Sequence, residues 1–447
     1  MGLEISGNTV SAGTSGTRAA ITTADKRNAF TAAFLGWTLD GFQTYTAVLV
    51  GQQVVTELVG PKSSALYFAG ILAITLASWA CGGLVSGVLA DYFGRRRVLM
   101  VSIVWYALFA GLTAVSPNYG LFMLFRFLTG LGMGAEWGPG SALVSELWSD
   151  RSRGRGIALL QGGFGVGFLV ATGVWLGLGG GPGAWRYMFL IGLLPAAVVI
   201  FVRRRVRDPE MWVAADAKRR RARDRARGGH ALSEQEKALT RFTVTHLLAD
   251  RQLRKLLITM LILATTTLGG WWAVSTWVPK FAAGFAALHH SNPAHTATIA
   301  ALWYNVGGVA GYFAMGVFND KFGRRGTLWV YYLGSLIMNV VLFKLAGTMV
   351  ALLAFAAING FFTLGQITWI ATWPVEVFPT HARGTAITIV FNATRFIVAG
   401  ATLLAGYLVD AFGSVSTAAL VIGCVYVFGL LFTFWAGPET KGVALPN

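Results

Sequence analysis

One sequence pattern occurs twice in the chain, as GVLADYFGRRR at residues 87–97 and as GVFNDKFGRR at residues 316–325. The two copies start 229 positions apart. A second pair of motifs, ELWSDRSRG at 146–154 and EVFPTHARG at 376–384, is separated by 230 positions. Two independent motifs that share nearly one offset indicate an internal duplication. The chain is therefore predicted to consist of two similar halves.

The composition places both halves in a membrane. Of the 447 residues, 55% are hydrophobic and 12% are charged, whereas a soluble chain carries about 25% charged residues. This excludes a soluble enzyme, a secreted disulfide scaffold and a disordered protein. A membrane-spanning helix needs about 20 mostly apolar residues. The sequence contains twelve such runs, at approximately 28–50, 66–90, 98–116, 119–146, 156–178, 184–202, 255–279, 297–318, 327–346, 349–374, 384–409 and 415–437.

The positive charge follows the topology of these spans. The net charge is +17, carried by 36 Lys and Arg against 19 Asp and Glu. If the N-terminus is cytoplasmic, only Lys62, Arg186, Lys280 and Lys344 lie on the outer side, and Arg126 and Arg395 lie within spans. All other Lys and Arg then face the cytoplasm, as the positive-inside rule requires. The basic balance therefore predicts an inner or plasma membrane protein with both termini in the cytoplasm, and not a nucleic-acid partner.

These observations predict an all-α membrane protein with twelve transmembrane helices in two pseudo-symmetric six-helix bundles. The predicted parts are a disordered cytoplasmic N-terminus (1–27), a first bundle (28–202), a basic cytoplasmic linker (203–254), a second bundle (255–437) and a cytoplasmic tail (438–447). Two interpretations of the linker stay open. It forms a short helix on the anionic inner leaflet, or it is a solvated connection that only fixes the topology.

The repeated motifs predict a gate at the cytoplasmic face. In the first motif, one glycine allows tight helix packing and another turns the chain. The aspartate at the C-terminal end of its helix needs cationic partners, because the helix dipole disfavours it there. Ion pairs that form when this face is shut would bias a two-state equilibrium; the alternative is simple anchoring of the topology. The candidate gating residues are Gly87, Asp91, Gly94, Arg95, Glu146, Arg153, Gly316, Asp320, Gly323, Arg324, Glu376 and Arg383.

With these motifs the chain resembles the major facilitator superfamily over all twelve spans. RFLTGLGMG at 126–134 resembles the fourth-helix motif of that superfamily. DGF at 40–42, GAEWG at 134–138 and FNATR at 391–395 are similar to proton symporters for sialate and monocarboxylates, and partly to aromatic-acid symporters. Many such relatives carry a second Asp where this chain has Gln43. The ending PETKG at 438–442 resembles that of sugar porters, which implies a neutral solute as an alternative substrate.

Four ionisable residues lie well inside predicted spans: Asp40, Arg126, Glu136 and Arg395. Buried charges are costly in a bilayer, at least about 2.5–3.5 kcal/mol each, so each is expected to face the interior with a partner. We interpret Asp40, Arg126 and Glu136 as the proton-coupling group, in which protonation of Asp40 releases Arg126. Two alternatives stay open. The charges form two salt bridges that only hold the bundle together, and Glu136 is either a second proton site or a packing hydrogen-bond donor.

Arg395 is predicted to bind an anionic substrate through its planar guanidinium. The other candidate substrate contacts are polar or aromatic residues predicted at similar depth, namely Asn392, Gln43, Gln366, Trp369, Tyr304 and Asn305. Tryptophan is also a common interfacial anchor, so Trp369 and its neighbours Trp271, Trp272 and Trp373 are each weak candidates alone.

The predicted function is secondary active transport, with proton-coupled uptake of a small organic acid anion by alternating access. The expected partners are the acid, protons and the lipid bilayer, with the chain acting as a monomer. No enzymatic activity, metal or cofactor is expected, and the proton gradient supplies the energy because the sequence has no nucleotide-binding Gly-x4-Gly-Lys-Ser/Thr pattern. The alternatives are a proton-coupled sugar or polyol symporter, a drug/proton antiporter, and a membrane sensor without net transport.

Overall fold

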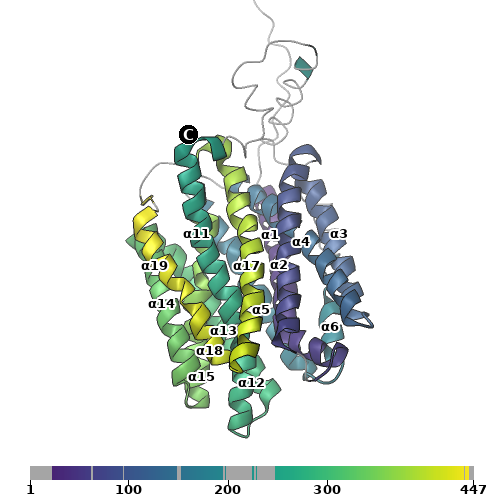
Figure 1. Cartoon of the computed structure of the whole chain (residues 1–447). Helices are drawn as coiled ribbons and strands as arrows, with labels where there is room; N and C mark the ends of the chain where they lie inside the picture. Colours follow the sequence, from purple (N-terminus) through teal and green to yellow (C-terminus); the bar gives the residue numbers. More distant parts are fainter. Residues whose placement is uncertain are drawn as a thin grey trace, which may run out of the picture.

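The computed structural model describes residues 23–61, 64–93, 95–147, 153–194, 197, 224–225, 228, 247–436 and 438–441, and for some of these only the backbone. Within these ranges all regular structure is helical (Figure 1). Most of the predicted N-terminal segment, the predicted linker and the last six residues lie outside them.

The first half contains α1 (Thr23–Leu58), α2 (Ala65–Phe93), α3 (Arg95–Ala114), α4 (Tyr119–Leu147), α5 (Arg153–Leu178) and α6 (Ala184–Ile191). The second half begins with α11 (Arg251–Val274), η1 (Ser275–Trp277), α12 (Val278–Leu288), α13 (Pro293–Phe322) and α14 (Arg324–Leu345). It ends with α15 (Met349–Thr363), η2 (Gly365–Ile367), α16 (Thr368–Val377), α17 (Thr380–Phe412), α18 (Val415–Gly423) and α19 (Val425–Ala436).

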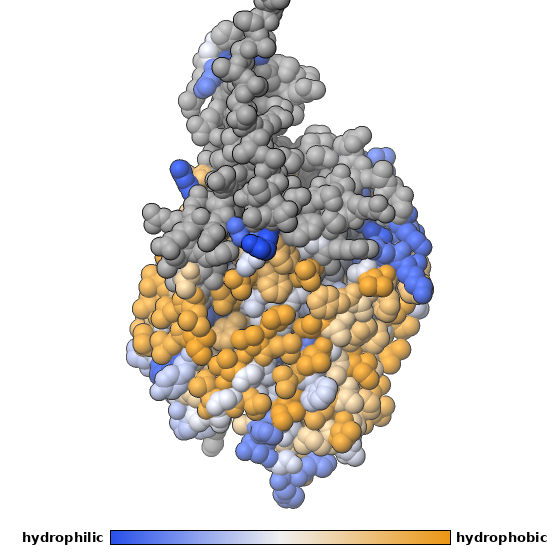
Figure 2. Space-filling model, turned by 180° about the vertical axis from the view of Figure 1, so that it is seen from behind, coloured by the Kyte–Doolittle hydropathy of each residue, from blue (hydrophilic) through white to orange (hydrophobic). Residues whose placement is uncertain are grey.

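Eleven of the twelve predicted spans coincide with these helices, and the sixth, 184–202, begins with α6 and lies partly outside the described residues. Three spans are broken helices, formed by α11 with η1 and α12, by α15 with η2 and α16, and by α18 with α19. In the described part of the chain, eight segments are long and apolar enough to cross a membrane. α1, α4 and α13 are also longer than the required length, with 36, 29 and 30 residues. Hydrophobic side chains cover the middle of the face drawn in Figure 2, and hydrophilic ones gather at its lower end.

Two of the broken helices have local causes. α12 has Pro279 in its first turn, which has no N–H to continue the ladder of α11, and the short η1 turn lies between the two helices. The break between α15 and α16 falls at η2, which starts with Gly365. Broken helices of this kind line the midplane sites of transporters, because the freed backbone groups are satisfied only inside protein.

The two halves meet along two pairs of helices. α2 packs against α17, and α5 packs against α13; α2 and α17 stand side by side in Figure 1. We call the end where α1 begins and α2 ends the inner end, at the top of Figure 1, and the opposite end the outer end. α1 packs against α5 and α4, and α4 packs against α2, so α1 and α4 lie beside the helices that join the halves.

Candidate functional site

Three positions on one face of α1 organise the buried charges of the first half. Gly36, Asp40 and Gln43 are spaced by four and three residues, so they share a helix face. At 1.5 Å per residue, about 10 Å of helix separates the first from the last. Asp40 and Gln43 are both fully buried. Gly36 faces Glu136, Asp40 lies within electrostatic range of Arg395, and Gln43 lies against Gly192; we call this arrangement, with Arg126, the polar column.

Glu136 of α4 forms the inner level of the polar column. Its carboxylate lies against Gly36, where any larger side chain would overlap Oε1 of Glu136. Tyr106 of α3 is also buried, and its hydroxyl lies within electrostatic range of the Glu136 carboxylate without a hydrogen bond of normal geometry. Gly132 leaves the space that the side chain of Tyr106 occupies against α4. The glycine at position 36 is therefore what allows a carboxylate to enter between α1 and α4.

Asp40 and Arg395 form the middle level. Arg395 of α17 donates from Nη1 to Oδ1 of Asn392 at 3.1 Å and to the carbonyl oxygen of Phe391. Its guanidinium carbon lies 4.3 Å from the centroid of the Trp79 ring and 4.1 Å from that of Phe391, in cation–π geometry. Asp40 is within electrostatic range of both Arg395 and Glu136. A charge from the second half thus enters the column of the first.

Arg126 and Gln43 form the outer level. Arg126 of α4 is fully buried, donates to Oγ1 of Thr75 at 3.3 Å, and lies 5.5 Å from the centroid of the Phe189 ring. Its Nε and Nη1 have no hydrogen-bond partner among the described residues. The amide of Gln43 lies against Gly192. Neither its oxygen nor its nitrogen has a hydrogen-bond partner among the described residues. The outer level therefore holds several buried, unused hydrogen-bonding groups.

The ion pair expected between Asp40 and Arg126 is absent from this structure. Across the described residues, none of the carboxylate oxygens of Asp40 and Glu136 has a hydrogen-bond partner, and neither residue forms an ion pair within 4 Å. The reason is a difference in level. Arg126 reaches Thr75 and Arg395 reaches Trp79, positions one turn apart on α2. The two arginines are therefore stacked along α2, and Asp40 lies nearer to Arg395.

Aromatic rings line the polar column. Trp37 of α1 stacks on Phe164 of α5 with centroids 4.8 Å apart, and it lies 6.2 Å from the rings of both Trp79 and Phe391. The row continues from Phe164 to Phe168, which stacks on both Tyr45 and Trp271 of α11. Flat walls of this kind suit a planar ligand, because ring faces pack best against flat groups.

The predicted polar contacts of the second half lie in a hydrogen-bonded network without charged members, which we call the neutral network. Tyr304 bonds Thr363 at 2.8 Å, and Asn359 donates to Asn339 at 2.8 Å. Gln366 donates to Ser335 at 3.2 Å. The indole of Trp369 donates to Thr267 at 2.9 Å, and Thr267 also bonds Tyr332. The four tryptophans 271, 272, 369 and 373 are all buried inside the protein, so none is an interfacial anchor here.

Asn305 connects the two halves. Its Nδ2 donates to Oγ1 of Thr172 on α5 at 3.2 Å, while its Oδ1 has no partner among the described residues. Tyr45 of α1 lies within interaction range of Asn305 and Tyr304. The aromatic row and the neutral network therefore meet at α13.

Two of the candidate gating residues of the second half, Arg324 and Glu376, are paired in the structure. Arg324 binds Glu376 through two hydrogen bonds, from Nη2 at 2.6 Å and from Nε at 2.9 Å. Asp320 is 3.8 Å from Arg324 and two-thirds exposed, so it contributes less. Glu376 is therefore the main partner of the motif arginine.

Glu439 and Thr440 add further contacts to this pair. Glu439 accepts from the backbone N–H groups of Arg324 and Arg325, at 3.0 and 3.2 Å, and caps the N-terminus of α14. Partial burial alone raises the pKa of Glu439, but the N–H donors around its carboxylate hold the pKa below its ordinary value. Thr440 donates to Glu376 at 2.5 Å. Gly323, with φ +83, lies against Glu439 and allows this approach. Gly316 lies within α13.

The remaining gating predictions lie outside the residues whose side chains the structure describes. They are Gly87, Asp91, Gly94, Arg95, Glu146, Arg153 and Arg383. The pairings expected of these residues therefore stay predictions, as does the gating role of the residues in both halves.

At the outer end, the halves are joined by a cap across their interface. Asp410 of α17 accepts from the N–H groups of Ala65 and Leu66, at 2.9 and 3.3 Å, and from the hydroxyl of Ser64. Nearby, the ring of Phe68 on α2 meets that of Trp277 with centroids 5.2 Å apart. A carboxylate at a helix N-terminus is favourable, so these contacts hold α2 to the second half at this end.

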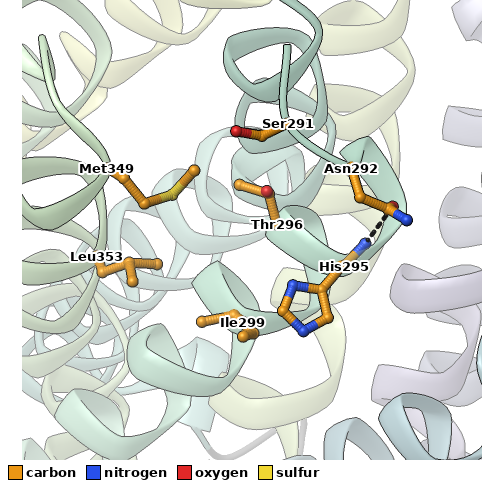
Figure 3. A pocket seen from close by; sticks show the side chains of 7 residues that line it. All are labelled: Ser291, Asn292, His295, Thr296, Ile299, Met349 and Leu353. Carbon is orange, nitrogen blue, oxygen red and sulfur yellow. Dashed lines mark hydrogen bonds between the residues drawn. The ribbon is translucent and has the colours of Figure 1, made fainter. Parts of the chain in front are cut away.

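A pocket of about 210 Å³ at the outer end lies away from these groups (Figure 3). It is lined by Ser291, Asn292, His295, Thr296, Ile299, Met349 and Leu353. Asn292 accepts from the backbone N–H of His295 and caps α13. The polar side chain of Asn292 therefore serves the start of a helix, and the lining of the pocket includes no charged side chain of the polar column.

This architecture, with broken helices and buried charges where two six-helix halves meet, defines a membrane transporter. The family described as "Sugar (and other) transporter" matches residues 28–447, and the chain belongs to it. The resemblance to the major facilitator superfamily is thereby confirmed, and the chain is not an enzyme.

The chain is similar to two curated transport proteins and, in its fold, to one solved structure. The probable 4-methylmuconolactone transporter of Cupriavidus pinatubonensis is 29% identical, covering 94% of this chain and 92% of that protein. The cis,cis-muconate transport protein of Acinetobacter baylyi is 26% identical, covering 80% and 82%. A partially occluded inward-open structure of the xylose transporter XylE from E. coli has a TM-score of 0.72 at 19% identity, covering 95% and 100%. The last match concerns the fold alone.

Several residues at the site gave little signal in the sequence. Thr75, Trp79 and Tyr106 lie in ordinary apolar stretches, and only the four-residue spacing of Thr75 and Trp79 hinted at a shared face. Gly36 precedes Asp40 by four residues, and this spacing was likewise the one sequence feature that placed it on the same helix face. Glu439 was noted as part of the chain ending, but its cap on α14 depends on a contact 115 positions away in sequence.

Proposed function

We propose that this protein is a proton-coupled symporter that takes up a small organic acid anion by alternating access. One observation carries the proposal: two guanidinium groups and two carboxyl groups are buried in one column without pairing to each other. Relatives named for muconate, gentisate and sialic acid transport support the substrate class.

The chemistry of the unpaired groups suits coupled transport. A carboxyl group buried without a partner is stable in its neutral, protonated form. A buried guanidinium cannot release its proton and needs an anion to offset its desolvation. In the proposed mechanism, Asp40 and Glu136 bind protons, and Arg395 binds the substrate carboxylate through its fork. Proton and acid then enter the site together, because each removes a charge that would otherwise stay uncompensated.

Other residues are assigned supporting roles in this proposal. Gln43 and Asn392 complete the wall beside the arginines, and Asn392 also orients Arg395 through the hydrogen bond at 3.1 Å. Tyr304, Asn305, Gln366 and Trp369 contact the uncharged part of the substrate from the second half.

Alternating access requires both ends to open in turn. In the proposed cycle, the Arg324–Glu376 pair and its Glu439 cap close the cytoplasmic end, and the Asp410 cap closes the outer end. The orientation follows the distribution of Lys and Arg, with both termini in the cytoplasm. Neither set of contacts touches the polar column, so both are proposed to change rates more than affinity.

A thermal-shift screen of the purified protein tests the substrate class. Organic acids, their neutral amides and sugars are compared at equal concentration, because only ligands that bind the folded state raise the melting temperature. We expect shifts with one or more acids and none with the amides. Shifts with sugars alone would instead favour a sugar symporter.

A further inference from the structure

The two arginines of the polar column are placed as a pair of anion-binding groups. Arg126 bonds Thr75 and Arg395 stacks on Trp79. Positions 75 and 79 are one turn apart on one face of α2, so the two guanidinium groups contact residues whose backbone positions are about 6 Å apart along the helix. Both side chains are at least nine-tenths buried, at 0% and 4% exposure. They therefore form two levels of one site.

Arg126 has donors that nothing in the described chain uses. Its Nε and Nη1 lack partners, as do both polar atoms of Gln43, which lies against Gly192, three residues after the Phe189 ring that Arg126 approaches. Buried donors without partners are rare in native proteins, because each costs free energy when desolvated. The carboxylates that would use them are absent from this level, since Asp40 and Glu136 face the middle and inner levels. The unused donors point to a second carboxylate supplied by the substrate.

We infer that the substrate is a planar dicarboxylate whose two carboxylates bind Arg395 and Arg126, an inference that rests on the proposed uptake of an organic acid. Gln43 donates to the carboxylate at Arg126, and Asn392 orients the guanidinium that binds the other. The rings of Trp37, Phe164 and Trp79 pack against the chain between the two carboxylates. A six-carbon conjugated diacid matches this offset and these flat walls.

Charge balance in the column agrees with a dianion. When Asp40 and Glu136 are protonated, the two guanidinium groups leave two positive charges at bilayer depth. One carboxylate offsets only half of that charge, and an uncompensated buried charge is costly. A dicarboxylate offsets both. Two protons and one dianion then cross the membrane together with no net charge.

A matched pair of ligands isolates the second carboxylate. trans,trans-Muconate and sorbate share the same six-carbon diene, but sorbate has a methyl group in place of one carboxylate. Isothermal titration of the purified full chain measures both affinities. We expect muconate to bind wild type at least about 30-fold more tightly than sorbate, since a buried charged hydrogen bond contributes on this scale.

Variants then assign the preference to Arg126. In Arg126→Gln the ratio of the muconate and sorbate affinities falls by about 30-fold or more, and Arg126→Lys retains part of it. The matched control is Arg186→Gln, because Arg186 bonds the carbonyl oxygens of Ala114 and Ser116 outside the column. The control is expected to keep the wild-type ratio.

The outcomes separate this inference from the proposed function. Equal wild-type affinities for muconate and sorbate overturn the dicarboxylate inference, whatever the variants do, and leave organic acid transport standing. A strong wild-type preference that Arg126→Gln and Arg126→Lys both leave unchanged overturns the role of Arg126. If neither acid binds and xylose does, the proposed function itself fails.

Discussion

The two halves of this transporter differ in their buried polar side chains: those of the first half include charged groups that are largely unpaired among the described residues, and those of the second half are mostly neutral and hydrogen-bonded. The polar column contains four ionisable side chains, and the carboxylates among them have no hydrogen-bond partners in the described chain. The neutral network of the second half has no charged member, and most of its groups are bonded, as in the chains Tyr304–Thr363 and Trp369–Thr267–Tyr332. Unpaired charges respond to protons and anions, whereas a satisfied neutral network fixes geometry. Under the proposed mechanism, the column couples transport to protons and the network orients the substrate.

The largest effect is expected from Asp40→Asn. The variant cannot exchange a proton at the middle level, so accumulation driven by a pH gradient should be abolished. Counterflow exchange of acid across proteoliposome membranes should survive in part, because the arginines are intact. Accumulation equal to that of wild type would remove Asp40 from the coupling mechanism.

Arg395 comes next, because it is the charge that the second half contributes to the column. Arg395→Lys keeps the charge and loses the planar fork, so binding should weaken markedly, and Arg395→Gln should weaken it further. Losing one partner of a buried charged hydrogen bond costs about 2–5 kcal/mol, or about 30-fold to several thousand-fold in affinity. The control ligand is a methyl ester. If the wild-type protein binds the ester and the acid with equal affinity, the role of Arg395 is structural.

A smaller effect is expected in the neutral network. Tyr304→Phe removes the hydroxyl bonded to Thr363, and a neutral hydrogen bond is worth about 0.5–1.5 kcal/mol. Affinity should fall about 2- to 10-fold, with the number of protons per acid unchanged in flux measurements. A change in that number would contradict the division of labour between the halves.

The gate is expected to affect turnover with the least effect on binding. Glu376→Gln weakens the two-bond pair with Arg324, so transport rates should change while affinity stays within about twofold. Asp320→Asn is the matched comparison, because Asp320 is exposed and only 3.8 Å from Arg324. Its effect should be the smaller of the two. A larger effect from Asp320→Asn would mean that the motif acts through another partner in the cycle.

Much of this architecture followed from the sequence. The twelve apolar runs and the offset of 229–230 residues predicted the helices and their duplication, because span length and hydropathy are local properties. The four buried charges were also found, since a charge inside a span is rare. The sequence did not predict which of these charges lie at the same depth, because the partners of a side chain depend on how the helices rotate and pack. Asp40 and Arg126 were expected to pair, yet Arg126 lies one turn further out, against Thr75.

The neutral network and the inner gate show the same limit. Gln366 and Trp369 were identified by depth in the span, but their partners Ser335 and Thr267 come from other helices. The bond between Arg324 and Glu376 joins two motifs that the sequence presented separately. Contacts between distant segments are decided by packing, which a single sequence does not display.

The central claim is that protonation of the column drives uptake of an organic acid. Proteoliposomes with an alkaline interior and a clamped membrane potential test it most directly, with the acid that gives the largest thermal shift as the radiolabelled substrate. The account predicts transient accumulation above the outside concentration, accompanied by alkalinisation of the medium and lost when a protonophore is added. Uptake that only equilibrates, with no proton movement and no response to the protonophore, would contradict it.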